Sequence, residues 1–190
     1  MIVARRFTLP LALCLLVLAA PSGHADFSLL PDRNSNIIMA AMANDLEKVQ
    51  TLLSKGTNPN TLDADGRTVL MHAATSGNVP LAKLMLNYSA KPTLVDKTGN
   101  TALHYAAERG NIEVLHMMLD AKAPPDALNK QGATPLMIAA GRGRVDVIRL
   151  LLERGASVAK QDFTGRDALS WAQDNRQNAI IPILRQAGAK

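Results

Sequence analysis

Glycine recurs at a fixed interval of 33 residues along most of this chain. One series occupies Gly66, Gly99, Gly132 and Gly165, and a second occupies Gly77, Gly110 and Gly143. A constant period of this length is typical of proteins built from stacked repeats, in which each unit buries its hydrophobic face against the next. The interval therefore fixes the register in which all other residues of the chain are compared.

A short helix is predicted after each glycine of the first series. Two positions later stands a residue with a short polar side chain, in the column Ser35, Thr68, Thr101, Thr134 and Asp167. Such residues cap helices because their side-chain oxygen accepts a hydrogen bond from a free backbone N–H of the first turn. A column of isoleucine or leucine follows, and an alanine column comes three residues after it. This spacing indicates the buried stripe of a helix.

A longer second helix is predicted after the second glycine series, because glycine allows the left-handed backbone that ends the first helix. We expect these second helices to end at Gly56, Ser89, Lys122, Gly155 and Gly188. An extended segment then leads to Asp63, Asp96, Asn129 and Asp162. Asp and Asn favour tight turns because their side chains bond the nearby backbone. Each unit is therefore predicted to be two helices followed by a hairpin-like finger.

Two segments at the start of the short helices resemble a known repeat signature. Residues 101–107 read TALHYAA and residues 134–140 read TPLMIAA, similar to the TPLHxAA-like signature of the ankyrin repeat. The resemblance covers residues 33–190 and implies an all-α solenoid of about five helix–turn–helix units with short β-hairpin-like fingers. Only His104 keeps the motif histidine, and the last unit departs from the pattern at Gln173 and Arg176.

The repeat columns divide most of the chain into five units. A divergent first repeat spans 33–65, further repeats span 66–98, 99–131 and 132–164, and a C-terminal capping repeat spans 165–190. The end units of a solenoid lack one neighbour and need a cap. Residues 26–32, which include Phe27, Leu29 and Leu30, are expected to cap the first repeat.

Residues 1–25 have the composition of a secretory signal peptide. Arg5 and Arg6 precede an apolar run at 9–20, and small residues lead to Ala25, after which we expect cleavage. The apolar run is short for a membrane span, although a retained anchor is the alternative. Cys14, the single cysteine, falls within this segment. The resemblance together with export points to a bacterial periplasmic member of the family, with secretion as the second choice.

The charge of the exported chain does not favour nucleic acid as a partner. Without residues 1–25 it has nineteen basic and sixteen acidic residues, a net charge of +3, which is too weak for nucleic-acid binding. Lys83, His116 and Arg149 share a column of the second helices. This column is interpreted as a solvated outer face, with contact to an anionic envelope polymer as the alternative.

No motif in the sequence predicts catalysis, a cofactor or a metal site. The chain has no HExxH segment, no paired cysteines and no GxSxG segment. His104 is expected to be a hydrogen-bonding packing residue, as the resemblance implies. His72 is expected to be partly buried on a first helix, and His116 lies on a second helix. We therefore do not predict an enzyme.

The variable columns of the fingers and of the first helices are the predicted binding surface. A stack of such units presents both on one concave side. Arginine and aromatic residues are enriched among the residues that dominate binding energy in interfaces, so Arg67, Arg109, Arg142, Phe163 and Arg166 are the predicted anchors. The complete predicted set is Arg67, Lys97, Asn100, Glu108, Arg109, Lys130, Gln131, Arg142, Phe163 and Arg166. Its positive bias suggests an acidic or polar partner surface.

The function predicted from these observations is protein binding outside the cytoplasm. The protein is expected to be an exported, non-catalytic interaction module that binds an envelope protein through its concave face and fingers. We expect it to be a monomer and to contact the membrane only through the signal segment before cleavage. A structural or protective envelope factor without one specific partner is the alternative, and an enzyme is the weakest one.

Overall fold

The computed structural model describes residues 33–189. The predicted signal peptide at 1–25 and the predicted capping segment at 26–32, with Phe27, Leu29 and Leu30, lie outside the described residues. Within 33–189 there are ten α-helices and no β-strand, which confirms the predicted all-α class. Not one of these helices is both long and apolar enough to cross a membrane.

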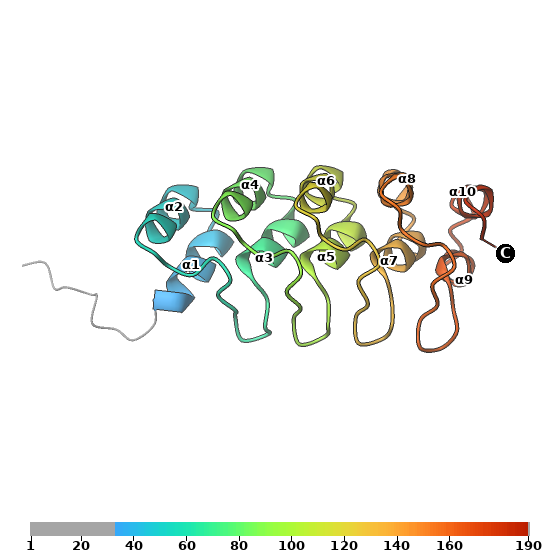
Figure 1. Ribbon diagram of the computed structural model, residues 1–190, viewed down its shortest axis with the longest axis horizontal. Coiled ribbons are helices and arrows are strands. Elements are labelled where there is room, and N and C mark those ends of the chain that lie inside the picture. Colours follow the sequence, from blue (N-terminus) through green and yellow to red (C-terminus); the bar gives the residue numbers. More distant parts are fainter. Residues whose placement is uncertain (1–32, 190) are drawn as a thin grey trace, which may run out of the picture. The chain divides into compact units, whose positions relative to one another are not determined.

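The helices form two layers of five (Figure 1). The inner layer contains α1 (Arg33–Met42), α3 (Val69–Ser76), α5 (Ala102–Arg109), α7 (Pro135–Gly141) and α9 (Ala168–Asp174). The outer layer contains α2 (Leu46–Ser54), α4 (Val79–Asn87), α6 (Ile112–Asp120), α8 (Val145–Glu153) and α10 (Ile181–Gln186). Each inner helix packs against the next inner helix and against the outer helix of its own pair. The pairs therefore stack in chain order, as the period predicts.

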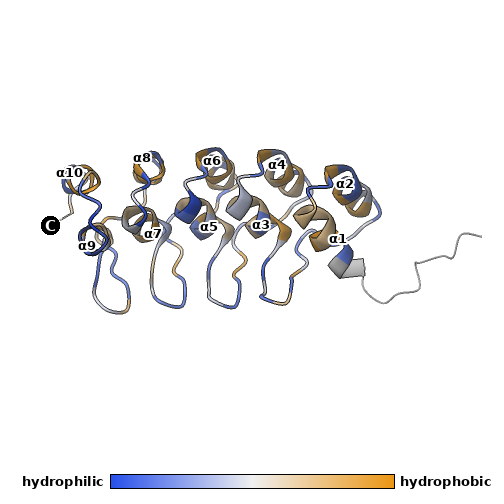
Figure 2. Ribbon diagram, turned by 180° about the vertical axis from the view of Figure 1, so that it is seen from behind, coloured by the Kyte–Doolittle hydropathy of each residue, from blue (hydrophilic) through white to orange (hydrophobic). Residues whose placement is uncertain are grey.

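The core runs between the two layers and follows the repeat columns. Leu70, Leu103 and Leu136 of the inner helices are at most 1% exposed. Met85, Met118 and Leu151 occupy one column of the outer helices and are completely buried. Figure 2 shows hydrophobic residues concentrated in the helices of both layers. The stack is therefore held by the burial of equivalent apolar side chains in successive units, which is the main driving force for folding.

The inner helices begin at the predicted caps, with one exception. Thr68 and Thr134 have extended backbones, and their hydroxyl oxygens accept bonds from the N–H groups of the residues three positions on at 3.2 and 3.3 Å. Asp167 caps α9 in the same way at 2.8 Å. The prediction for Ser35 is wrong, because α1 begins at Arg33. Arg33 stands in the leading-glycine column, so no glycine turns the chain before this helix.

The predicted helix ends adopt left-handed backbone whether or not they carry glycine. Ser89 and Lys122 end α4 and α6 with φ of 62° and 63°. Arg176, which replaces glycine after α9, has φ of 57°. A residue with a Cβ atom costs about 1 kcal/mol or more in this conformation. The stacking of the helices thus imposes the turn geometry on side chains that do not prefer it.

Four fingers connect the helix pairs and project from the inner layer, at residues 61–67, 94–100, 127–133 and 160–166 (Figure 1). In the first finger, Asp63 Oδ1 accepts bonds from the N–H groups of Asp65 and Arg67, both at 2.8 Å. The other three fingers repeat this turn. Neighbouring fingers are joined by backbone hydrogen bonds of 3.0 Å from the N–H groups of Lys97, Lys130 and Phe163 to the carbonyls of Asp65, Thr98 and Gln131.

Candidate functional site

The predicted binding residues lie on the fingers and on the adjoining ends of the inner helices. We call the surface formed by the exposed residues of the four fingers and of the inner helices the finger face. Four of the ten predicted residues line one pocket, namely Asn100, Glu108, Gln131 and Arg142. Four others are exposed on the same face, namely Lys97, Arg109, Lys130 and Phe163. Arg67 and Arg166 remain partly exposed, and each guanidinium lies over an aromatic ring of the protein.

Arg67 belongs to a buried cluster between the first two fingers. Its guanidinium carbon lies 5.0 Å from the centroid of the Tyr105 ring, and its Nε lies 3.7 Å from Asp96 Oδ2. Asp96 is 5% exposed and accepts a hydrogen bond from the Tyr105 hydroxyl. Burial raises the pKa of Asp96, but hydrogen bonds from Thr98, Tyr105 and Asn100 outweigh it, so the pKa lies below its usual value. This predicted anchor therefore links two repeats.

Arg166 forms a similar cluster within the last finger. Its guanidinium lies 5.1 Å from the Trp171 ring centroid and 3.0 Å from Asp162 Oδ2. Trp171 Nε1 donates to the same carboxylate at 2.9 Å. Burial raises the pKa of Asp162, but hydrogen bonds from Thr164, Arg166 and Trp171 hold it well below its usual range. The guanidinium of Arg166 thus stabilises the finger to which it belongs and is only partly available to a binding partner.

This cluster is absent where the third unit meets the fourth, and a pocket of about 290 Å³ occupies the place. Asn129 stands for the aspartate, Ile138 for the aromatic ring and Ala133 for the arginine. Asn129 Oδ1 still accepts from the Ala133 N–H at 3.0 Å, and its Nδ2 donates to Asn100 Oδ1 at 2.9 Å. The pocket is lined by Asn100, Glu108, Asn129, Gln131, Ile138, Gly141, Arg142, Trp171 and Asn175. The predicted set omits five of these residues, of which Gly141 and Asn175 stand in the variable columns of the inner helices. The small fourth-unit residues at 138 and 141 were a usable signal.

Arg142 and Glu108 form an ion pair at the edge of this pocket. Arg142 Nη2 lies 2.7 Å from Glu108 Oε1, and the arginine side chain is 59% exposed. The partners come from successive units, since Glu108 is on α5 and Arg142 follows α7. Arg109 is also exposed, and within residues 33–189 it makes no ion pair. The charge of Arg142 is therefore balanced locally, whereas that of Arg109 is available to a partner.

An apolar row on the fingers was not predicted from the sequence. Leu62, Val95 and Leu128 occupy one repeat column, directly before the Asp or Asn that forms the turn of their fingers. Their exposed fractions are 52%, 52% and 47%. Large apolar side chains that remain exposed in a row are common where proteins bind other molecules. The row could have been predicted from the sequence, because the 33-residue period places an apolar residue at the same position of three successive fingers.

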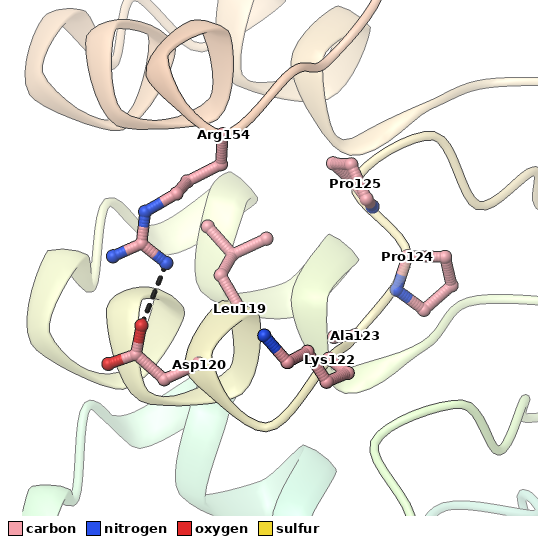
Figure 3. Close-up of a pocket in the computed structure, with 7 residues that line it drawn as sticks. All are labelled: Leu119, Asp120, Lys122, Ala123, Pro124, Pro125 and Arg154. Atoms are coloured by element: carbon pink, nitrogen blue, oxygen red, sulfur yellow. Dashed lines mark hydrogen bonds and ion pairs between the residues drawn. The ribbon is translucent and has the colours of Figure 1, made fainter.

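A second pocket, of about 440 Å³, lies at the ends of the outer helices α6 and α8 (Figure 3). It is lined by Leu119, Asp120, Lys122, Ala123, Pro124, Pro125 and Arg154. Arg154 Nη1 donates to Asp120 Oδ1 at 2.8 Å. His116 Nδ1 lies 2.9 Å from the other oxygen of the same carboxylate. These charges are paired with one another, and the pocket includes no residue of the predicted set.

The three histidines of residues 33–189 have structural partners. His104 is 1% exposed, its Nδ1 accepts from the Thr101 N–H at 3.1 Å, and its Nε2 donates to the Ala133 carbonyl at 3.1 Å. Burial lowers its pKa by disfavouring the charged ring. His72 Nε2 lies 2.8 Å from Asp63 Oδ2. The predicted packing role of His104 is confirmed. In the described part of the chain, no three His, Cys, Asp or Glu side chains are grouped so as to hold a metal ion.

Comparison with known proteins supports the repeat interpretation. A family model described as ankyrin repeats in three copies matches residues 37–127. A second, described as ankyrin repeats in many copies, matches residues 103–152. The two matches together extend over 37–152, which is more than half of the chain. A comparison with curated proteins gave no match.

Proposed function

Because the chain belongs to the ankyrin-repeat family, we propose that it acts by binding one envelope protein through its finger face. Ankyrin repeats are in general protein-binding modules without catalytic activity. The observation that carries the proposal is the gathering of four predicted residues from two successive units around one pocket. Exposed Arg109 and Phe163 lie on the same face, and Phe163 is 74% exposed. Such residues commonly provide most of the energy in protein interfaces.

The N-terminal sequence supports a partner in the periplasm. Arg5 and Arg6 before an apolar run at 9–20 have the pattern of a signal peptide, so the chain is directed to the periplasm. Cys14 lies before the expected cleavage site, so the exported chain has no thiol to be oxidised there. Stacked repeats can form a stable domain without disulfides because they bury a continuous core. The chain then acts as a monomer and occupies, tethers or masks its partner.

Export is tested by fractionating cells that express the full chain. Osmotic shock should release a protein whose N-terminal residue, identified by mass spectrometry, is Asp26. A chain that begins at Met1 and remains with the membrane fraction would support the retained anchor. A full-length chain in the cytosolic fraction would contradict export, although it would not affect the protein-binding proposal.

Binding is tested by capture from an envelope extract with two matched double variants. Arg109→Ala with Arg142→Ala removes two cations from the finger face, and Lys83→Ala with Arg149→Ala removes two exposed cations from the outer helices. The finger-face variant should reduce capture of the dominant partner by about tenfold or more, because anchors of this type each contribute more than about 1 kcal/mol. The outer-helix variant should capture normally.

Two outcomes would overturn the proposal. Equal capture by both double variants would show that the finger face does not bind the partner. Cross-linking in intact cells that gives a smear of adducts, with no dominant species, would instead favour a general structural or protective factor.

A further inference from the structure

The fourth unit forms a notch in the finger face because it carries small residues where its neighbours carry large ones. Gly141 stands in the column of Thr75, Glu108 and Asp174, and Ala133 stands in the column of Arg67, Asn100 and Arg166. Ile138 stands in the column of His72, Tyr105 and Trp171. The pocket of about 290 Å³ described above is the space that results. It lies at the lower end of the range for ligand pockets, about 300 to 1,000 Å³, so its size suits a single side chain.

The walls of the notch are held in place by neighbouring units. On one side, Asn100 accepts from Asn129 Nδ2 at 2.9 Å and donates to Thr98 Oγ1 at 3.0 Å. On the other side, Trp171 is fixed by its hydrogen bond of 2.9 Å to Asp162. A site whose walls are already ordered loses little conformational entropy when it binds. The notch is therefore prepared for an occupant before binding.

The charges around the notch cancel. Glu108 and Arg142 are its only ionisable lining residues, and they are paired at 2.7 Å. A charged occupant would have to compete with this pair for a counter-charge, whereas a neutral occupant leaves the pair intact. The other polar lining residues carry amides, which donate and accept hydrogen bonds. The notch thus favours a neutral group that also donates and accepts.

We propose that the notch receives one glutamine or asparagine side chain of the partner protein. A primary amide is flat and neutral, and it has both donors and an acceptor. Its faces can lie against Trp171 and Ile138 while its edges bond to the amides of Gln131 and Asn175. This proposal rests on the proposed function, because it assumes that a protein binds the finger face, and it adds which side chain that face selects.

Trp171 provides a direct test because it is the only tryptophan of the chain. Its fluorescence therefore reports on the notch alone. The full chain is titrated with the N-acetyl N′-methylamides of glutamine, asparagine, lysine and glutamate, of which only the first two carry a primary amide, and with N-acetylglucosamine. The glutamine and asparagine probes should give a saturable change in the millimolar range. The lysine and glutamate probes should bind about fivefold more weakly, because the two ionisable residues of the notch are already paired with each other. Equal responses, a preference for a charged probe, or a response to the sugar alone would overturn the proposal.

Variants of two lining residues show whether the response comes from the notch. A Cβ atom at Gly141 would lie 3.1 Å from Trp171 Cε3 and 3.3 Å from Asn175 Nδ2, so Gly141→Ala narrows the space. Asn175→Ala removes an exposed amide whose one hydrogen bond within residues 33–189 is to the Trp171 carbonyl at 2.9 Å, at the end of α9, so the fold should tolerate it. Both should weaken the glutamine response at least threefold, as expected for one lost hydrogen bond of about 1 kcal/mol. Thr75→Ala, the matched control in the second unit, should leave it unchanged.

The same variants separate this inference from the proposed function. In one outcome, Gly141→Ala captures the envelope partner as well as the unchanged protein does, while Arg109→Ala with Arg142→Ala does not. This result would overturn the proposal for the notch and leave the proposal that the finger face binds the partner intact. If no variant of the finger face alters capture, both proposals fail. An unchanged glutamine response in both Gly141→Ala and Asn175→Ala would also overturn the notch.

Discussion

Gly132 and Gly165 offer a matched test of how much one finger depends on the next. They occupy the same column and have similar backbones, with φ of 76° and 82°. A Cβ atom at Gly132 would lie 2.8 Å from the backbone nitrogen of Phe163 and 2.7 Å from its ring. A Cβ atom at Gly165 would meet nothing within 4 Å. The two positions therefore differ in packing against the neighbouring finger while sharing the same backbone requirement.

The expected losses follow from this difference. Gly165→Ala should lower the free energy of unfolding by about 1 to 2 kcal/mol, the cost of an alanine in left-handed backbone. Gly132→Ala should lose that amount and in addition about 1 to 3 kcal/mol, the usual cost of forcing an extra carbon into a packed site. The neighbour at Gly132 is backbone, which moves only with the whole finger. We therefore predict that the free energy of unfolding falls further in Gly132→Ala than in Gly165→Ala.

Urea denaturation at equilibrium, followed by circular dichroism, measures both variants against the unchanged protein. Gly132→Ala should unfold at the lower urea concentration. Equal midpoints would refute the reasoning, because they would show that the third and fourth fingers separate without cost. A larger loss in Gly165→Ala would refute it as well.

Two further predictions concern the helix ends and a buried carboxylate. Ser89→Gly and Lys122→Gly should each raise the free energy of unfolding by about 1 kcal/mol, because glycine removes the cost of a side chain at positive φ; unchanged urea midpoints for both would contradict this. Because the pKa of Asp162 lies below its unfolded value, the stability it contributes is complete above about pH 4 and is lost as the pH falls further. Asp162→Asn should therefore lose stability less steeply between about pH 4 and 2 in urea titrations, and parallel curves would contradict this.

The features that were predictable from the sequence have local causes. The hydroxyl of Thr68 or Thr134 caps the helix that starts one residue later, so the cap is visible in the residue type. The left-handed backbone at Ser89 and Lys122 was predictable only because glycine occupies their column in other units. Ser35 shows the limit of this reasoning. Its residue type suits a cap, but Arg33 replaces the leading glycine of the other units, and Ser35 lies within α1.

The features that were not predictable depend on contacts between units. Arg67 and Arg166 share a column, and the sequence offered no reason to separate them. Arg67 reaches forward to Asp96 of the next finger and to Tyr105 of the next unit, whereas Arg166 folds back onto Trp171 of its own unit. Within residues 33–189 no further finger lies beyond Arg166. The partner of such a side chain is therefore decided by what stands next to the unit.

The pocket on the finger face was only half predictable for the same reason. Its exposed polar residues, such as Asn100 and Arg142, stood out as variable columns. Gly141 stood in a variable column but was not chosen, and Ile138 did not stand out, because a pocket is formed by side chains that are missing relative to neighbouring units. Comparing the volumes of residues within a column would have revealed it, whereas looking for reactive or charged residues could not.

The hydrogen bonds between fingers determine how such a protein can change its length. The donating N–H groups belong to one repeat column and the accepting carbonyls belong to another, and both columns repeat every 33 residues. A duplicated segment of that size brings its own donor and its own acceptor, so both joins pair normally. An insertion of another size puts mismatched atoms opposite each other. Tandem duplication of whole units is thus the route by which this architecture can enlarge its binding surface during evolution.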